Sequence, residues 1–274
     1  DNILFNKDKS RIISFRNQKL TSYVIPNSVT NIGKGAFASC SSLAEVVIPN
    51  SVTSIGKGAF ASCSSLAEVV IPNSVTNIED RAFCGCRSLA EVVIPNSVIS
   101  IGNRTFTNCR SLSEVVIPNS VTSIGGFAFS GCESLTEVVI PNSVVCINGN
   151  PFVKWEGKLE CLSPSFVYED NILFNKDKSR IISFRNQKLT SYVIPASVTR
   201  IGDRAFFRCE SLTEVVIPNS VISIGDRTFC CCESLTDIVI PDSVTSIGDR
   251  AFYGCSFPYN LKQELISRFG RKIF

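Results

Sequence analysis

The chain is 274 residues long, has 44% hydrophobic residues and carries a net charge of +3 from 27 basic and 24 acidic side chains. This small positive excess does not point to nucleic acid or an anionic membrane, and no apolar run approaches the roughly 20 residues of a membrane helix. The sequence has no histidine, so it lacks the usual general base near neutral pH and the commonest nitrogen ligand of zinc. We therefore expect no enzyme activity, no cofactor, no nucleic-acid partner and no membrane insertion.

The chain opens with a hairpin-type unit at residues 1–24. Ile3–Phe5 and Arg11–Phe15 are apolar runs separated by a polar turn, a pattern that predicts a β-hairpin. The stretch Asp1–Pro26 recurs letter for letter at Asp170–Pro195. This favours a structural bulge that sets the curvature of the fold, and a dedicated binding protrusion is the alternative. Because the chain starts inside a motif and has no methionine, we expect a mature or excised fragment whose signal and anchor lie outside it.

Residues 25–145 hold a regular repeat, marked by an Ile-Pro pair that recurs every 23 residues. The pair begins at Ile25, Ile48, Ile71, Ile94, Ile117 and Ile140 and, after a gap, at Ile194, Ile217 and Ile240. A fixed period of this length predicts a solenoid whose coils bury their apolar side chains only against their neighbours. We therefore expect one solenoid domain over residues 1–274.

The path of one coil follows from side-chain alternation. Residues two apart on a strand share a face, so Val46 and Ile48 should point inward while Glu45 and Val47 point outward. Pro49 then starts a turn. The apolar positions expected to re-enter the core are Val52, Ile55, Ala59, Phe60, Cys63 and Leu66.

The repeat pattern I-P-x-S-V-x-x-I-x-x-x-A-F-x-x-C-x-S-L-x-x-V-x is similar to that of the BspA-like leucine-rich repeats, which are common in bacterial surface proteins. The resemblance covers nearly the whole chain. It implies a curved leucine-rich-repeat solenoid of stacked parallel β-strands joined by short turns or 3₁₀ segments. It also implies adhesion or binding of a host protein. We expect a cell-surface or secreted location, and the alternative is the cytoplasm. The family has no shared catalytic residues to carry over.

Residues 146–193 interrupt the repeat with an irregular insertion that contains the second hairpin. Trp155 supplies bulk at a position where neighbouring repeats have cysteine. We interpret Trp155 as a core filler. The alternative is a partly exposed tryptophan that acts as a binding hot spot.

Regular repeats return over residues 194–255, and the pattern changes at residues 256–274. Asn260 followed by Gln263 is typical of a capping box, and Gly270 is a typical helix end. The expected apolar stripe is Leu261, Leu265 and Phe269, and the expected ion pair is Glu264 with Arg268. We therefore predict a C-terminal helix at Asn260–Phe269 that covers the open end of the core.

The 13 cysteines fall into two groups. Eight share one core position, where free cysteine behaves as a small buried hydrophobe: Cys40, Cys63, Cys86, Cys109, Cys132, Cys209, Cys232 and Cys255. The others are Cys84, Cys146, Cys161, Cys230 and Cys231. Neither zinc-site spacing nor a disulfide framework is present, so we expect free thiols and no metal site.

Two outward ladders mark the predicted sheet face as the candidate binding site. The acidic ladder is Glu45, Glu68, Glu91, Glu114, Glu137, Glu214 and Asp237, and the apolar ladder is Val47, Val70, Val93, Val116, Val139, Val193, Val216 and Val239. Exposed apolar stripes mark interaction surfaces, although strand propensity and solubility copied by duplication explain the same ladders. We expect a non-enzymatic binding module that docks a protein or glycan partner here. The alternative is a structural spacer without a specific ligand.

Asp-Arg pairs recur on the opposite bends of the coils, for example Asp203-Arg204, Asp226-Arg227 and Asp249-Arg250. We expect these pairs to be solvated surface. A row of Ser and Thr side chains, which includes Ser51 and Thr53, is a further outward set.

Overall fold

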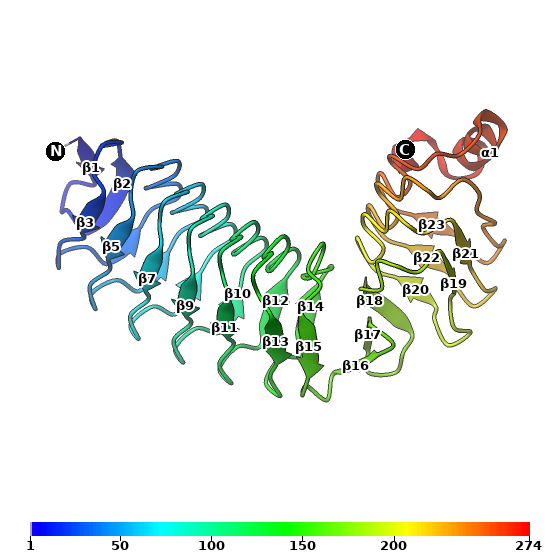
Figure 1. Cartoon of the computed structure of the whole chain (residues 1–274), viewed down its shortest axis with the longest axis horizontal. Coiled ribbons are helices and arrows are strands. Elements are labelled where there is room, and N and C mark those ends of the chain that lie inside the picture. The colour runs from blue at the N-terminus through cyan, green and yellow to red at the C-terminus, as the bar shows by residue number, and fades with distance from the viewer. Residues whose placement is uncertain (1) are drawn as a thin grey trace. The chain divides into compact units, whose positions relative to one another are not determined.

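The computed structural model describes residues 2–274, so Asp1 of the first predicted unit lies outside the described part. It contains two compact units, one that ends at Ser163 and one that spans Pro164–Phe274. Within each unit the coils follow one another in chain order, with short parallel strands stacked from coil to coil (Figure 1). The stacked-strand solenoid that the sequence predicts is confirmed.

Each regular coil of unit 1 contributes strands to two sheets. The isoleucine sheet consists of β1 (Ile3–Phe5), β2 (Arg11–Phe15), β4 (Asn31–Ile32), β6 (Ser54–Ile55), β8 (Asn77–Ile78), β10 (Ser100–Ile101), β12 (Ser123–Gly125) and β14 (Cys146–Asn148). The valine sheet consists of β3 (Ser22–Val24), β5 (Glu45–Val47), β7 (Glu68–Val70), β9 (Glu91–Val93) and β11 (Glu114–Val116), and the pair β13 (Glu137–Ile140) and β15 (Lys158–Cys161) comes next along the chain. Sequence analysis identified only the valine sheet, because strands of two residues show no alternating pattern.

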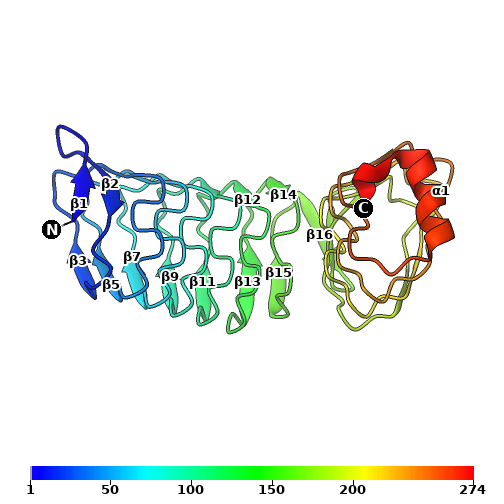
Figure 2. The ribbon, with the colours of Figure 1, turned by 90° about the horizontal axis from the view of Figure 1, so that it is seen from above.

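Unit 2 repeats this arrangement with its own two sheets. Its isoleucine sheet consists of β16 (Phe166–Glu169), β17 (Ile172–Asn175), β18 (Arg180–Phe184), β20 (Arg200–Ile201), β22 (Ser223–Ile224) and β23 (Ser246–Ile247), and its valine sheet is β19 (Ser191–Val193) with β21 (Glu214–Val216). Figure 2 shows the coils of this unit as closed loops seen end-on, with the C-terminal helix at their rim. Residues 237–239, which share the predicted strand position, are not in a strand.

Both predicted hairpins are present, and each joins an isoleucine sheet. Strand β2 pairs antiparallel with β1 and parallel with β4, and β18 pairs in the same way with β17 and β20. The inward side chains Ile12 and Phe15 are buried, as are Ile181 and Phe184. Each hairpin therefore forms an early coil of its unit and contributes to the core.

A column of stacked phenylalanine rings fills the centre of unit 1. Its members are Phe37, Phe60, Phe83, Phe106, Phe129 and Phe152, all buried. Neighbouring rings are 5.0–6.2 Å apart between centroids and within 13° of parallel. Burial of a phenylalanine side chain stabilises a fold by about 1.5–3 kcal/mol, so the column is a principal source of stability. The predicted core position of Phe60 is confirmed.

The ladder cysteines of both units are buried thiols, as predicted. Seven of them donate to the carbonyl oxygen of a phenylalanine in the preceding coil, with Sγ–O distances of 3.0–3.6 Å. The Phe37 carbonyl also accepts the amide hydrogen of Cys40 at 3.1 Å, so the thiol of Cys63 adds a second hydrogen bond to the same acceptor. Trp155 is only 3% exposed and donates from Nε1 to the carbonyl of Leu135 at 2.7 Å. Its interpretation as a core filler is confirmed, and an exposed hot spot at this position is wrong.

Polar ladders hold the turns of successive coils together. The hydroxyl of Ser51 donates to the carbonyl of Val29 at 2.7 Å, and its copies repeat this contact. Asp203 Oδ1 accepts the amide hydrogen of Asp226 at 3.0 Å, and Asp226 accepts that of Asp249 at 2.9 Å. These aspartates therefore cap the next coil, a role that the expectation of plain solvated surface missed.

The predicted C-terminal cap is present, with local corrections. Helix α1 spans Tyr259–Phe269 and is followed by the 3₁₀ helix η1 (Arg271–Ile273). The predicted capping box is wrong, because Pro258 is the N-cap and Asn260 already lies in the first turn. The helix ends at Gly270, which has a φ of 83°.

The C-terminal segment closes the last coil through backbone and side-chain contacts. Arg268 Nη1 donates to the carbonyl of Ile240 at 3.0 Å, and Nη2 lies 3.4 Å from Asp242 Oδ1, so the predicted pair with Glu264 is wrong. The amide of Phe252 donates to the carbonyl of Ile273 at 2.8 Å. Leu265 is buried against the core. The end segment thus takes the place of the missing next coil.

Candidate interaction surface

The outer face of the unit 1 valine sheet is built by its parallel register. Each glutamate pairs with the glutamate of the next strand and each outer valine with the next outer valine. The middle residue of each strand points inward and is buried, as Val69 and Val92 show. The ladders that the sequence predicts are therefore in place over β5 to β11, with neighbours about 4.8 Å apart.

The outer valines form an apolar stripe along this face. Val70, Val93 and Val116 are 66%, 59% and 62% exposed, and Val24 of β3 continues the stripe in register with Val47. Sequence reasoning missed Val24, although it included Val193 from the identical strand of the second copy. Contiguous exposed apolar side chains are a mark of interaction surfaces.

The glutamates of the same strands form an unneutralised row beside the stripe. Glu45, Glu68, Glu91 and Glu114 are exposed. Within residues 2–274, none of these four forms an ion pair. Repulsion between unit charges at this spacing is roughly 1 kcal/mol per pair in water. A cationic group that binds to these glutamates relieves the repulsion between them.

The row ends where the irregular insertion begins. Lys158 Nζ lies 2.6 Å from Glu137 Oε1 and 3.9 Å from Glu160 Oε2. The hydrogen bond that Lys158 donates to Glu137 raises the pKa of Lys158 above its ordinary value. Val139 is only half-exposed. Glu137 and Val139 are both predicted site residues. Glu137 is paired with a lysine and Val139 is less exposed, whereas within residues 2–274 the glutamates and outer valines of β5 to β11 are unpaired and exposed.

The other predicted site residues lie in unit 2. Glu214 and Val216 are on β21, paired with β19, which carries Val193. Val239 and Asp237 lie outside any strand, and Asp237 Oδ1 accepts the amide hydrogen of Ile238 at 2.8 Å. The predicted residues therefore form two patches, a long one in unit 1 and a short one in unit 2.

A shallow groove adjoins the start of the long patch. It has a volume of about 520 Å³ and lies where β3 and β5 pass into their Pro-Asn turns. Val24, Val47, Pro49 and Asn50 are among its lining residues. The groove extends the stripe with a hollow that can take an apolar side chain.

Other chemistry has little support in the described part of the chain. No group of three or more His, Cys, Asp or Glu side chains among residues 2–274 could hold a metal ion. Cys230 and Cys231 have their sulfur atoms 3.6 Å apart, but burial raises the pKa of Cys230 to about 12. No helix among the same residues has the length and apolar character needed to cross a bilayer.

Comparisons with known proteins agree with this architecture. The model of the BspA type leucine rich repeat region matches residues 11–110, 53–163 and 180–274. A leucine rich cell surface protein from Faecalibacterium prausnitzii is similar at 30% identity, with a TM-score of 0.70 over 92% of this chain and 84% of that one.

More distant solved structures share the fold. The pneumococcal vaccine antigen PcpA is 24% identical with a TM-score of 0.60, and the match covers 85% of this chain but only 54% of PcpA. A leucine-rich repeat protein from Eubacterium ventriosum is 21% identical with a TM-score of 0.55, over 92% of this chain and 68% of that one. No curated protein matches the chain. The family match spans most of both units, and the chain therefore belongs to the BspA-type leucine-rich-repeat family.

Proposed function

We propose that the protein is a non-enzymatic binding module of a bacterial cell-surface or secreted protein, and that it docks a protein partner on the valine sheet of unit 1. The observation that carries this proposal is the exposed valine stripe beside four unpaired glutamates. A partner segment that presents apolar side chains flanked by lysine or arginine complements both features. The similar F. prausnitzii protein is described as a cell surface protein, which supports the location.

The two parts of the surface have separate roles in this proposal. Exposed charges mainly set the association rate and its salt dependence, whereas buried apolar contact sets the dissociation rate. The glutamates therefore steer a basic partner toward the sheet, and the valines hold it there. The glycan alternative has less support on this face, because valine offers no hydrogen bonds to sugar hydroxyls.

The test begins with an array of purified extracellular-matrix proteins and defined glycans, screened against the full chain by biolayer interferometry. A triple variant with Val70, Val93 and Val116 changed to serine should speed dissociation from any protein that binds. Changing Glu68, Glu91 and Glu114 to lysine should slow association and weaken its salt dependence.

Matched controls come from exposed apolar residues elsewhere on the coils. Ile99 and Val145 are 57% and 64% exposed but lie outside the valine sheet, so changing both to serine should leave binding unaltered. If the valine triple variant and the Ile99/Val145 control weaken binding of the same protein equally, the proposed site is wrong. No binder in the array would favour the alternative, a structural spacer without a specific ligand.

A further inference from the structure

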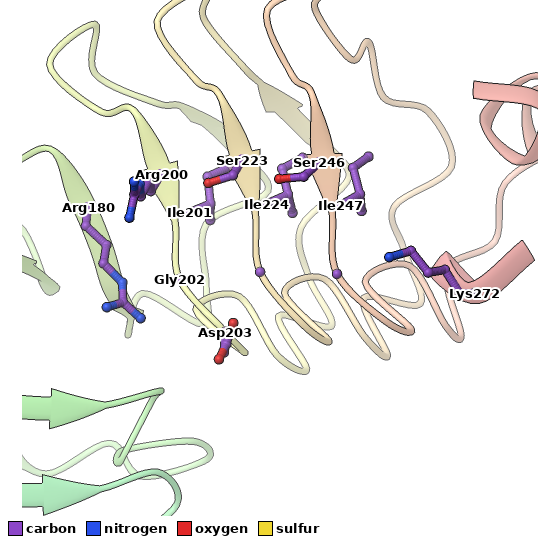
Figure 3. A pocket seen from close by; sticks show the side chains of 12 residues that line it. Arg180, Arg200, Ile201, Gly202, Asp203, Ser223, Ile224, Ser246, Ile247 and Lys272 are labelled. Carbon is purple, nitrogen blue, oxygen red and sulfur yellow. The ribbon is translucent and has the colours of Figure 1, made fainter. Parts of the chain in front are cut away.

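A second surface with the opposite charge lies on the isoleucine sheet of unit 2. A groove of about 400 Å³ crosses β18, β20, β22 and β23 there (Figure 3). The glycines that follow the strands let neighbouring coils approach each other closely. A Cβ atom at Gly202, for example, would come within 2.6 Å of the carbonyl oxygen of Ile181.

The strand register places four polar side chains in one outward row across this groove. Arg180 is in register with Arg200, Arg200 with Ser223, and Ser223 with Ser246. Neighbours in the row are about 4.8 Å apart, so the row extends over roughly 14 Å. The row therefore carries two arginines followed by two serines, and the Arg180 side chain extends from it toward Gly202 (Figure 3).

Arg180 and Arg200 are directly adjacent in register, although the Arg180 guanidinium extends away from Arg200 (Figure 3). Within residues 2–274, neither Arg180 nor Arg200 forms an ion pair or a side-chain hydrogen bond. Like charges on directly adjacent strands destabilise a sheet, and guanidinium groups bind carboxylate and sulfate oxygens in a bidentate manner. This end of the groove is consequently suited to an anionic ligand.

Two further charged residues line the groove. Lys272 lies at the end opposite the arginines (Figure 3), and its Nζ is 3.9 Å from Asp249 Oδ1. Among the described residues that line the groove, Asp203 is the one carboxylate, and its Oδ1 already accepts the amide hydrogen of Asp226. The lining thus has three cations against one carboxylate.

Unit 1 provides a natural comparison, because its hairpin has the same sequence. The residue equivalent to Arg180 is Arg11, but its partner in register is Asn31. Ser54 and Asn77 then continue that row. The pair of adjacent arginines is therefore specific to unit 2 and is not a by-product of the repeated hairpin.

We propose that this groove binds an acidic saccharide, with Arg180 and Arg200 holding its carboxylate or sulfate groups. The hydroxyls of Ser223 and Ser246 pair with sugar hydroxyls farther along the row. An acidic peptide is favoured less, because the groove lies on the face of the sheet, where the backbone groups already pair between strands and offer no strand-type hydrogen bonds. This site is independent of the valine sheet and has the opposite charge preference.

Calorimetric titration of the full chain with four oligomers of equal length tests the ligand class. The oligomers are a sulfated dextran, an oligogalacturonate, neutral dextran and oligoglutamate. We expect the two acidic saccharides to bind, more weakly as ionic strength rises, and neutral dextran not to bind. Comparison of the first two shows whether sulfate or carboxylate is preferred. Binding of oligoglutamate as tight as that of both saccharides would overturn the assignment to a saccharide.

Four substitutions test the location. Arg180→Asn and Arg200→Asn should each weaken binding roughly tenfold, and the fold should tolerate the second because unit 1 has asparagine at that place. Arg11→Asn is the matched control in unit 1 and should have no effect.

Asp203→Asn tests whether the negative charge of Asp203 weakens binding of the acidic saccharide. Asn103 makes the equivalent contact in unit 1, where its Oδ1 accepts the amide hydrogen of Gly126 at 2.9 Å, so the amide side chain can keep the cap. Loss of the negative charge should tighten binding roughly two- to fivefold. If Arg180→Asn and Arg200→Asn keep a native circular dichroism spectrum and an unchanged affinity for the acidic saccharides, the proposed site is wrong. This result would not depend on whether the valine sheet binds its own partner.

Discussion

Removal of one ring from the phenylalanine column tests the description of the core most directly. Phe83 is fully buried and lies 5.4 Å from Phe60 and 5.8 Å from Phe106, with both pairs 4° from parallel. Phe83→Ala leaves a cavity between two rings that cannot close it, since both belong to fixed coils. Truncation of a buried phenylalanine costs about 3–5 kcal/mol.

The loss should appear in urea-induced unfolding of the full chain, followed by circular dichroism. With a denaturant dependence of about 3 kcal/mol per molar urea, the midpoint of unit 1 should fall by roughly 1 M or more. Coils of a solenoid contact only their neighbours, so hydrogen exchange should rise most in the coils next to Phe83. Phe83→Leu retains most of the buried volume and should cost much less.

The equivalent change in unit 2 is the control. Phe229 lies between Phe206 and Phe252 at 5.0 and 5.7 Å, so Phe229→Ala should destabilise unit 2 and leave exchange in the coils around Phe83 unaltered. A midpoint shift below about 0.3 M for Phe83→Ala would refute the reasoning, because it would mean that the column is loosely packed. Destabilisation spread evenly over both units would refute the neighbour-only coupling.

Four more predictions concern thiol reactivity, pH dependence, coil caps and domain organisation. In the folded protein Cys146 should react first with a thiol reagent because it is exposed, whereas burial raises the pKa of Cys132 to about 12 and should protect it; mass spectrometry after brief alkylation distinguishes them. Because buried thiols stay protonated while unfolded ones ionise near pH 8.5, the free energy of unfolding should fall as pH rises from about 8.5 toward 12, and a flat profile in urea titrations would contradict the burial of the ladder. Asp226→Ala should cost about 1 kcal/mol in thermal unfolding and Asp226→Asn much less, since only alanine removes the acceptor for the Asp249 amide. Because the chain divides into two compact units at Pro164 and coils couple only to their neighbours, limited proteolysis near Pro164 should release a resistant 164–274 fragment; loss of both units at the same rate would instead favour the single domain that the sequence predicts.

The 23-residue period was sufficient to predict the core. The inward positions of Phe60, Cys63 and Val69 follow from counting along the repeat, because each coil presents the same backbone to its neighbour. The outer ladder was predictable for the same reason. What the period could not provide was any contact that depends on an irregular segment, such as the pairing of Glu137 with Lys158 from the insertion.

The arginine pair escaped notice because the hairpin coil is shorter than the others. A step of 23 residues back from Arg200 reaches Asp177, whereas the structure pairs Arg200 with Arg180. The turn aspartates were misjudged because an exposed carboxylate that caps a neighbouring coil has the same sequence signature as one that is merely solvated. The partner of Arg268 depends on how the helix packs on the last coil, which no pattern within the helix specifies.

The identical hairpins have a consequence for how the gene can change. The two copies, Asp1–Pro26 and Asp170–Pro195, start 169 positions apart and place β2 and β18 in the same relation to the coil that follows. An in-frame recombination between them would remove or add 169 residues and still join each strand to a partner of the correct register. Alleles of this protein should therefore differ in length by whole blocks of that size as well as by single coils, with every remaining ladder unbroken.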